Sequence, residues 1–263
     1  MRAISLAFHD VADGPPQTVS AAVYAIDRET FEAHLCAIEK ERRFVSAMRQ
    51  RAQWDMDRPI FLTFDDGRFG NYVSAAPALE QHRWHGHFFI TTDWIGNPGY
   101  MNSGQIQELH NRGHVIGSHS SSHPERMSAL SEEKLLREWR DSCAALSSII
   151  GQPIRVASVA GGYYSRKVAK AAAQAGVEVL FTSEPTCEAS LVDGCLVLGR
   201  YSIQRHTAPD VCGRIAAGQI VERWRQTSLW KAKKILKLLA GDTYITLRRR
   251  FFSRRLMGQR AIR

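Results

Sequence analysis

Two acidic residues stand at the end of a short apolar run. Residues 59–67 read Pro-Ile-Phe-Leu-Thr-Phe-Asp-Asp-Gly, which predicts a buried strand that ends at Asp65 and Asp66, with a turn at Gly67. Successive side chains of a strand point to opposite faces, so two neighbouring aspartates rarely serve one apolar core. At a strand end both can reach a cleft, where parallel α/β folds place their chemistry. A solvated Asp-Asp-Gly turn is the alternative.

A pair of histidines follows another apolar run. Residues 114–123 read His-Val-Ile-Gly-Ser-His-Ser-Ser-Ser-His, in which Val115 and Ile116 predict a second short strand. His119 and His123 are four residues apart, a spacing that predicts two imidazoles on one face of a helical turn. Two histidines and one carboxylate are a common ligand set for a hydrolytic metal that keeps a position open for water. Alone, such a pair is more often a surface feature, but the aspartates upstream favour a metal site.

These two segments resemble the motifs of the polysaccharide deacetylases, carbohydrate esterase family four. The family's first motif is Thr-Phe-Asp-Asp and its second is His-[Ser/Thr]-x-x-His, and the resemblance covers roughly residues 3–205. It implies that Asp65 is the catalytic base and that Asp66, His119 and His123 hold a divalent metal. Zinc is the natural metal for a His-His-Asp set, with cobalt, nickel and manganese as alternatives.

The later motifs of the family match less well. Its third motif usually carries an Arg and ends in Pro-Tyr, whereas residues 158–164 read Ser-Val-Ala-Gly-Gly-Tyr-Tyr. The resemblance places Tyr163 at the motif's Tyr, whose main-chain N–H would help to bind an oxyanion; an ordinary strand-to-helix turn is the alternative. Arg200, which follows a later apolar run, is a candidate replacement for the missing Arg.

The general acid is the least defined part of the expected site. The family's fourth motif is not found, and its fifth would supply a His as the acid. His206 is the only His after residue 123 and is therefore the default candidate, with a surface His as the alternative. The first predicted strand ends at His9, which would lie at the same barrel end as Asp65. For His9, a structural role with a hydrogen-bond partner is the alternative to catalysis.

Apolar runs alternate with segments of helical periodicity, which predicts parallel β/α units. The expected strands lie at residues 3–8, 59–65, 86–92, 115–116, 154–159 and 177–181, and residues 195–203 contain a further apolar run that Gly199 and Arg200 break. With the resemblance, this pattern implies an α/β fold: the irregular β/α barrel of about seven parallel strands found in the deacetylases, followed by a basic helical tail. The chain of 263 residues is long enough for one large domain. We expect a catalytic domain over residues 1–222 and an amphipathic tail over residues 223–263.

Positive charge is concentrated in the tail. Residues 227–263 carry a net charge of +10, while the remaining 226 residues carry −1. Residues 228–240 predict a basic amphipathic helix capped by Ser228. This composition suits peripheral contact with an anionic membrane; a helix docked on the barrel with a solvated basic end is the alternative. Nothing else in the chain is typical of a nucleic-acid-binding module, so no nucleic-acid partner is expected.

The sequence suggests a cytoplasmic enzyme at the inner face of the membrane. The five cysteines are scattered, which favours free thiols in a reducing compartment, and no apolar run has signal-peptide or transmembrane length. The expected activity is metal-dependent removal of acetyl groups from an N-acetylated sugar, polysaccharide or glycolipid precursor. One alternative is a catalytically degenerate member that binds glycan. The other is hydrolysis of a non-sugar carbon–nitrogen amide bond.

Overall fold

A curled, mostly parallel sheet forms the centre of the computed structural model, which describes residues 1–14, 19–41, 45–53 and 58–232. Its strand order is β10-β11-β9-β8-β7-β6-β5-β1-β12, and β10 alone along this order runs antiparallel to its neighbour. These strands are β1 (Ile4–Phe8), β5 (Ile60–Phe64), β6 (His87–Ile90), β7 (Val115–Ser118), β8 (Val156–Ser158), β9 (Val179–Phe181), β10 (Ser190–Val192), β11 (Cys195–Leu198) and β12 (Tyr201–Ser202). Short strands β2 (Asp10–Val11) and β3 (Ala25–Ile26) pair with each other, and β4 (Val45–Ser46) pairs with β5.

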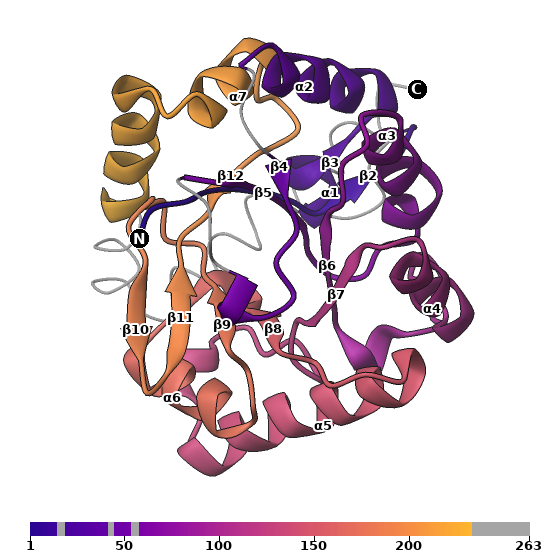
Figure 1. Ribbon diagram of the computed structural model, residues 1–263, viewed down its shortest axis with the longest axis vertical. Coiled ribbons are helices and arrows are strands. Elements are labelled where there is room, and N and C mark those ends of the chain that lie inside the picture. Colours follow the sequence, from indigo (N-terminus) through magenta and orange to yellow (C-terminus); the bar gives the residue numbers. More distant parts are fainter. Residues whose placement is uncertain (15–18, 42–44, 54–57, 233–263) are drawn as a thin grey trace.

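Helices surround this sheet on its outside, as the predicted alternation requires (Figure 1). They are α1 (Val19–Tyr24), α2 (Arg28–Lys40), α3 (Ala76–Gln81), α4 (Ser103–Asn111), α5 (Glu132–Ile150), α6 (Arg166–Gln174) and α7 (Pro209–Ala216), followed by a helix that begins at Ile220. The short helical turns are η1 (Arg51–Gln53), η2 (Asn71–Ala75), η3 (Thr92–Trp94), η4 (Met127–Ala129) and η5 (Ala160–Gly162). Within the described parts of the chain, no helix has the length and apolar character needed to cross a membrane.

The apolar run over residues 195–203, which Gly199 and Arg200 break, forms two strands near opposite edges of the sheet. β11 pairs with β9, whereas β12 pairs with β1, so Gly199 and Arg200 span the seam between the two edges. A side chain at Gly199 would not fit, because a Cβ there would lie 2.3 Å from the carbonyl oxygen of Glu184. The crossing holds the sheet in a barrel-like curl and carries Arg200 into the interior, where 1% of its surface is exposed.

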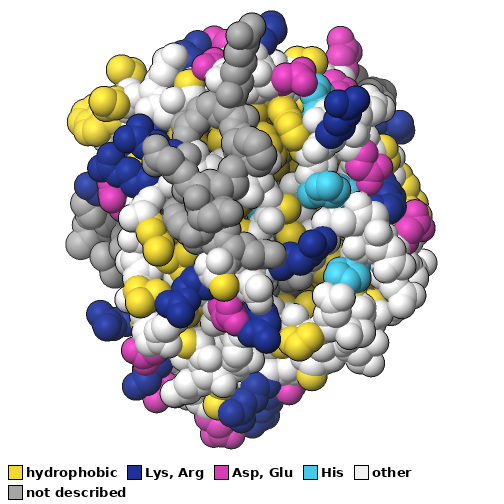
Figure 2. Space-filling model, viewed as in Figure 1, with side chains coloured by type: hydrophobic (Ala, Val, Ile, Leu, Met, Phe, Trp, Pro, Cys, Tyr) yellow, Lys and Arg dark blue, Asp and Glu magenta, His cyan; other side chains and the backbone are white. Residues whose placement is uncertain are grey.

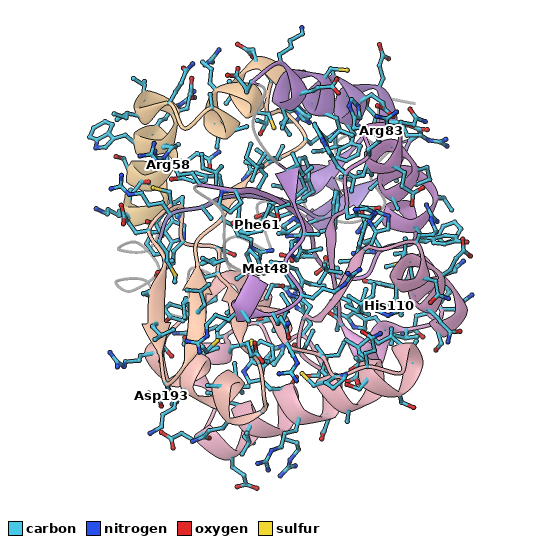
Figure 3. All side chains as sticks on the ribbon, in the orientation of Figure 1. Met48, Arg58, Phe61, Arg83, His110 and Asp193 are labelled. Carbon is cyan, nitrogen blue, oxygen red and sulfur yellow. The ribbon has the colours of Figure 1, made fainter. Side chains whose placement is uncertain are left out.

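Two apolar cores follow from the alternation of side chains along the strands. One fills the inside of the curl and contains Phe61 and Met48, which lie near the centre of the ring (Figure 3). The other lies between sheet and helices and contains Ile60, Leu62 and Phe64. Because Phe61 and Asp65 are four residues apart along β5 and its extension, they share a face, so Asp65 is directed to the inside of the barrel above an apolar base.

The helix that begins at Ile220 differs from the sequence-based expectation. It runs to residue 232, the last described residue, so Ser228 lies inside a helix and is not its N-cap. The rest of the predicted 228–240 helix, and the arginine-rich block after it, lie outside the described residues. The boundary between residues 222 and 223 stays a prediction.

The buried imidazole of His87 makes the stability of the fold sensitive to acid. It packs against Phe61 and Phe181 with ring centroids 5.4 Å away from each, and burial lowers its pKa to about 4. An unfolded histidine has a pKa near 6.5, so between about pH 6.5 and 4 the unfolded state binds a proton that the folded state does not. Stability is therefore lost as the pH falls through this window.

Replacing His87 tests this pH dependence. For His87→Phe, we expect the free energy of unfolding to fall between pH 6 and pH 5 by about 1 kcal/mol less than in the unchanged protein. Urea unfolding of each protein at pH 6 and at pH 5 gives its change in the free energy of unfolding. The contributions of other titrating groups cancel when the two changes are compared. Equal pH slopes for the two proteins would contradict the assignment.

Candidate active site

Three side chains that follow β5 and β7, two strands separated by β6, converge at the carboxyl ends of the strands. Asp66 follows β5, and His119 and His123 follow β7. The Nε2 atoms of His119 and His123 lie 3.5 Å and 3.6 Å from Oδ1 of Asp66, and one ligand atom from each residue lies within 4.8 Å of the others. Tetrahedral zinc with bonds of about 2.0–2.1 Å would separate its ligand atoms by roughly 3.3 Å. The donor set and its spacing therefore fit a small divalent metal.

The chain reaches this geometry without the predicted helical turn. His119 directly follows a strand and His123 lies beyond a bend, where Ser120 and His123 adopt left-handed backbone angles with φ of 66° and 56°. The prediction of a helical turn is thus wrong, although the two imidazoles still meet, with ring centroids 5.2 Å apart. Asp66 is also left-handed, with φ of 73°. Such conformations cost energy in residues other than glycine, and here they aim two of the three donors.

Glu138 of α5 holds the bend in place. Its Oε2 accepts hydrogen bonds from the N–H groups of Ser121 and Ser122 at 3.0 and 2.9 Å, and its Oε1 accepts one from the Ser122 hydroxyl at 2.6 Å. The N–H of His123 donates to the Ser120 hydroxyl at 3.1 Å. The serines between the two histidines therefore position the second histidine.

Asp65 is paired with Arg200 in the barrel interior. Arg200 donates from Nη1 to Oδ1 at 2.7 Å and from Nη2 to Oδ2 at 2.8 Å, and 3% of Asp65 is exposed. Its Nε also donates to the Thr182 carbonyl oxygen at 3.0 Å. Burial would raise the pKa of Asp65, but the charge of the Arg200 guanidinium outweighs it and holds this pKa well below its ordinary value. The structure thus brings the candidate replacement for the third-motif Arg into contact with the predicted base.

Ser158, at the end of β8, joins the predicted base to a predicted metal ligand. The Nδ1–H of His119 donates to the Ser158 hydroxyl at 2.5 Å, and this hydroxyl donates to Oδ1 of Asp65 at 3.0 Å. With its proton on Nδ1, the His119 ring presents the lone pair of Nε2 to the metal site. Burial lowers the pKa of His119 to about 4, so the ring is neutral at pH 7, as a metal ligand must be.

Removing the Ser158 hydroxyl should weaken metal binding. Ser158→Ala leaves His119 with the Ser158 carbonyl oxygen, 3.2 Å from Nδ1, as its partner, so the ring is less well oriented. Loss of a hydrogen-bond partner of a metal-binding histidine typically lowers metal affinity about 10–100-fold. Zinc titration by calorimetry should show such a loss, whereas Ser142→Ala, at another buried serine whose hydroxyl lies 2.7 Å from that of Ser118, should bind zinc normally. Equal affinities for both variants would show that the bridge does not orient the ligand.

Tyr163 follows a glycine pair that packs against the loop after His123. Gly161 and Gly162 both have positive φ, of 67° and 71°, and a Cβ on Gly161 would lie 2.5 Å from the carbonyl oxygen of Glu125. Only glycine allows this close approach in a left-handed conformation. The turn therefore brings the Tyr163 main chain to the same end of the barrel as the metal site, and the oxyanion role of its N–H stays a prediction.

The two candidate proton donors differ in their surroundings. His9 follows β1, stacks on Tyr24 with ring centroids 4.2 Å apart, and lines a small cavity together with Asp10 and Asp66. Its Nδ1 is buried and has no hydrogen-bond partner within the described residues. His206, by contrast, is exposed in the turn before α7. The arrangement favours His9.

An aromatic and cationic rim lies beside the metal site. Trp94 stacks on His123 with ring centroids 4.9 Å apart, and Tyr100 lies 5.0 Å from Trp94. The Arg68 guanidinium sits 4.4 Å from the Tyr100 ring, and its Nε is 4.0 Å from Oδ2 of Asp66. Sequence reasoning missed these residues, together with Ser158 and Glu138. Ser158 alone carried a usable signal, since it is a polar residue at the end of a buried strand, as Asp65 is.

Comparison with known proteins gives one family. A family model described as "Polysaccharide deacetylase" matches residues 53–180, which include both predicted motifs. The putative polysaccharide deacetylase YxkH of Bacillus subtilis is 25% identical over 186 residues, covering 68% of this chain and 64% of that protein. The peptidoglycan-N-acetylmuramic acid deacetylase PdaA of the same organism is 33% identical over 70 residues, covering 26% of this chain and 25% of that protein. The chain thus spans less than two thirds of the length of each of these relatives.

Solved structures share the fold. The Streptococcus pyogenes deacetylase PplD, determined in complex with acetate, superposes with a TM-score of 0.69 and 20% identity over 80% of this chain and 96% of that one. IcaB from Ammonifex degensii gives a TM-score of 0.67 with 18% identity, over 82% of this chain and 97% of that one. The curled parallel sheet with outer helices is therefore the deacetylase β/α barrel.

Proposed function

The chain belongs to the polysaccharide deacetylase family, and we propose that it is a metal-dependent hydrolase that removes an acetyl group from an N-acetylated sugar. One observation carries the proposal: a His-His-Asp donor set lies directly beside a buried, ionised carboxylate that the chain holds in a fixed orientation. Asp66, His119 and His123 would hold the metal, and zinc fits this donor set best.

The metal would supply two things to amide hydrolysis: a bound water of lowered pKa and a Lewis acid for the carbonyl oxygen. The proton of the attacking water would pass to Asp65. Oδ1 of this carboxylate already accepts from Ser158 and Arg200, whereas Oδ2 accepts from Arg200 alone among the described residues. Oδ2 is therefore the atom on which we place the proton.

Two further groups would complete the reaction. The main-chain N–H of Tyr163 would donate to the developing oxyanion, a contact typically worth about 3–4 kcal/mol. His9 would deliver a proton to the leaving sugar amine, since a nitrogen cannot leave an acyl carbon easily as an anion. Its place at the end of β1, next to the cavity that it shares with Asp66, supports this role.

The relatives support a sugar substrate. PdaA is named a peptidoglycan-N-acetylmuramic acid deacetylase, and YxkH is named a putative polysaccharide deacetylase. We extend this to the present chain as an N-acetylated sugar in a polysaccharide or a glycolipid precursor, and we place the reaction at the inner face of an anionic membrane. A catalytically degenerate glycan binder is the second candidate, motivated by the missing third-motif Arg; the contact of Arg200 with Asp65 weighs against it.

A substrate screen tests the proposal. Zinc-loaded and chelator-treated protein would be incubated with N-acetylglucosamine oligomers, glycan containing N-acetylmuramic acid, O-acetylated sugars and small cyclic amides. We expect acetate release from N-acetylated sugars in the zinc-loaded protein only. Glycan binding without acetate release would indicate the degenerate member, and ring opening of a cyclic amide would indicate hydrolysis of a non-sugar amide.

A further inference from the structure

The helix that begins at Ile220 docks on the barrel through polar side chains. Arg223 donates from Nε to the Tyr201 hydroxyl at 3.0 Å, Gln226 donates to the Ser202 carbonyl oxygen at 3.2 Å, and Thr227 donates to the Pro185 carbonyl oxygen at 2.8 Å. An ordinary surface helix buries its apolar stripe against the core and exposes its polar face. Here these three polar side chains face the barrel, and several large apolar side chains lie on the outside.

Its outer face is apolar and cationic. Ile220, Val221, Trp224 and Leu229 are 76%, 75%, 71% and 54% exposed. At about 100° per residue, these positions fall on the half of the helix opposite Arg223 and Gln226. The space-filling view shows hydrophobic side chains beside a group of Lys and Arg over this helix, at the upper left (Figure 2).

Acidic side chains do not interrupt this face. The exposed charged residues of the described helix are Arg225 and Lys231, while the carboxylate of Glu222 is bonded to Arg214 and its side chain is 14% exposed. Single exposed apolar residues are ordinary, but four of them on one short helix, together with two cations, form a patch of a kind that marks interaction sites.

We propose that this outer face, formed by Ile220, Val221, Trp224, Leu229, Arg225 and Lys231, is a docking surface for an anionic lipid bilayer. The apolar side chains would enter the boundary between headgroups and acyl chains, with the indole at the depth that tryptophan favours. The charge of the chain indicates which partner binds this outer face. From residue 227 onward the sequence carries +10, against −1 for the rest, which complements anionic headgroups and disfavours a second copy of the same face. This surface is independent of the proposed deacetylase activity.

Sedimentation of the full-length protein with vesicles tests the proposal. At low salt, the protein should bind vesicles of phosphatidylcholine with phosphatidylglycerol and should not bind vesicles of phosphatidylcholine alone. Ile220→Ser combined with Trp224→Ser should lower apparent vesicle affinity at least about tenfold, because two inserting side chains are lost. Val73→Ser, at a side chain that is 41% exposed on η2, serves as the matched control and should bind normally.

Three results would overturn the proposal. The first is an unchanged protein that stays in the supernatant with anionic vesicles at low salt. The second is a double variant that sediments like the unchanged protein, which would show that the outer face is not the contact. The third is an unchanged protein that is dimeric in solution and becomes monomeric in the double variant, which would identify a second copy as the occupant. Circular dichroism of each variant confirms that it is folded.

Discussion

Replacing Asp65 by Asn should lower the rate of acetate release about a thousandfold while metal binding persists. An amide keeps the shape of the carboxylate but cannot accept the proton of the attacking water, and a positioned general base contributes roughly 10²–10⁴-fold. The three metal donors, Asp66, His119 and His123, are untouched by the change. The loss should appear in kcat with little change in KM, because Asp65 acts on the water and not on the bound sugar.

The control for this variant is Asp93→Asn. The Asp93 carboxylate is also near the site, where it accepts a hydrogen bond from the Ser121 hydroxyl at 3.0 Å, but it is exposed. We expect nearly unchanged acetate release for Asp93→Asn. If Asp65→Asn retains activity within tenfold of the unchanged protein, Asp65 is not the base, whatever the outcome at Asp93.

Replacing Arg200 by Met should destabilise the fold by about 3–5 kcal/mol, because it leaves a carboxylate buried without its counter-charge. Methionine has a similar length and no charge, so the cavity left behind is small. Without Arg200, burial would dominate at Asp65 and raise its pKa, which would make the predicted base partly neutral. Urea unfolding measures the stability, and acetate release measures the loss of the ionised base.

A second substitution separates the ion pair from simple packing. The double variant Arg200→Met with Asp65→Asn removes both charges, so it should recover a large part of the lost stability without recovering activity. Arg137→Met changes an exposed arginine that is bonded to Glu133, and it should cost no more than about 1 kcal/mol. A stability loss below 1 kcal/mol for Arg200→Met alone would contradict the assigned role of the pair.

The sequence predicted the parts of the site that depend on short segments, through their hydrophobic pattern and their motifs. Residues 59–67 alone predict a buried strand that ends next to Asp65 and Asp66, and β5 ends at Phe64 as this pattern requires. The meeting of Asp66 with His119 and His123 was expected from the resemblance to the deacetylase motifs, and parallel strands, which place their carboxyl ends at one edge, make it possible. The alternation of strands and helices predicted parallel β/α units, and the resemblance to the deacetylases implied that they form a barrel.

Other parts depend on contacts between distant segments. Arg200 lies 135 residues after Asp65, and it reaches this partner because Gly199 and Arg200 cross from β11 to β12, which lie near opposite edges of the sheet. An apolar run such as residues 195–203 does not show where a strand changes neighbours. The bend after His119 likewise depends on Glu138 in α5, which no helical or strand period in residues 114–123 could indicate.

Metal content measures the central claim most directly. The purified protein, reloaded with zinc and freed of excess ion, should hold one zinc per chain by elemental analysis. His119→Ala and His123→Ala should each lose most of it, because each removes one of three protein donors, and His206→Ala should keep the full amount. Stoichiometric zinc in both His119→Ala and His123→Ala would contradict the account, since the metal would then be bound elsewhere in the chain.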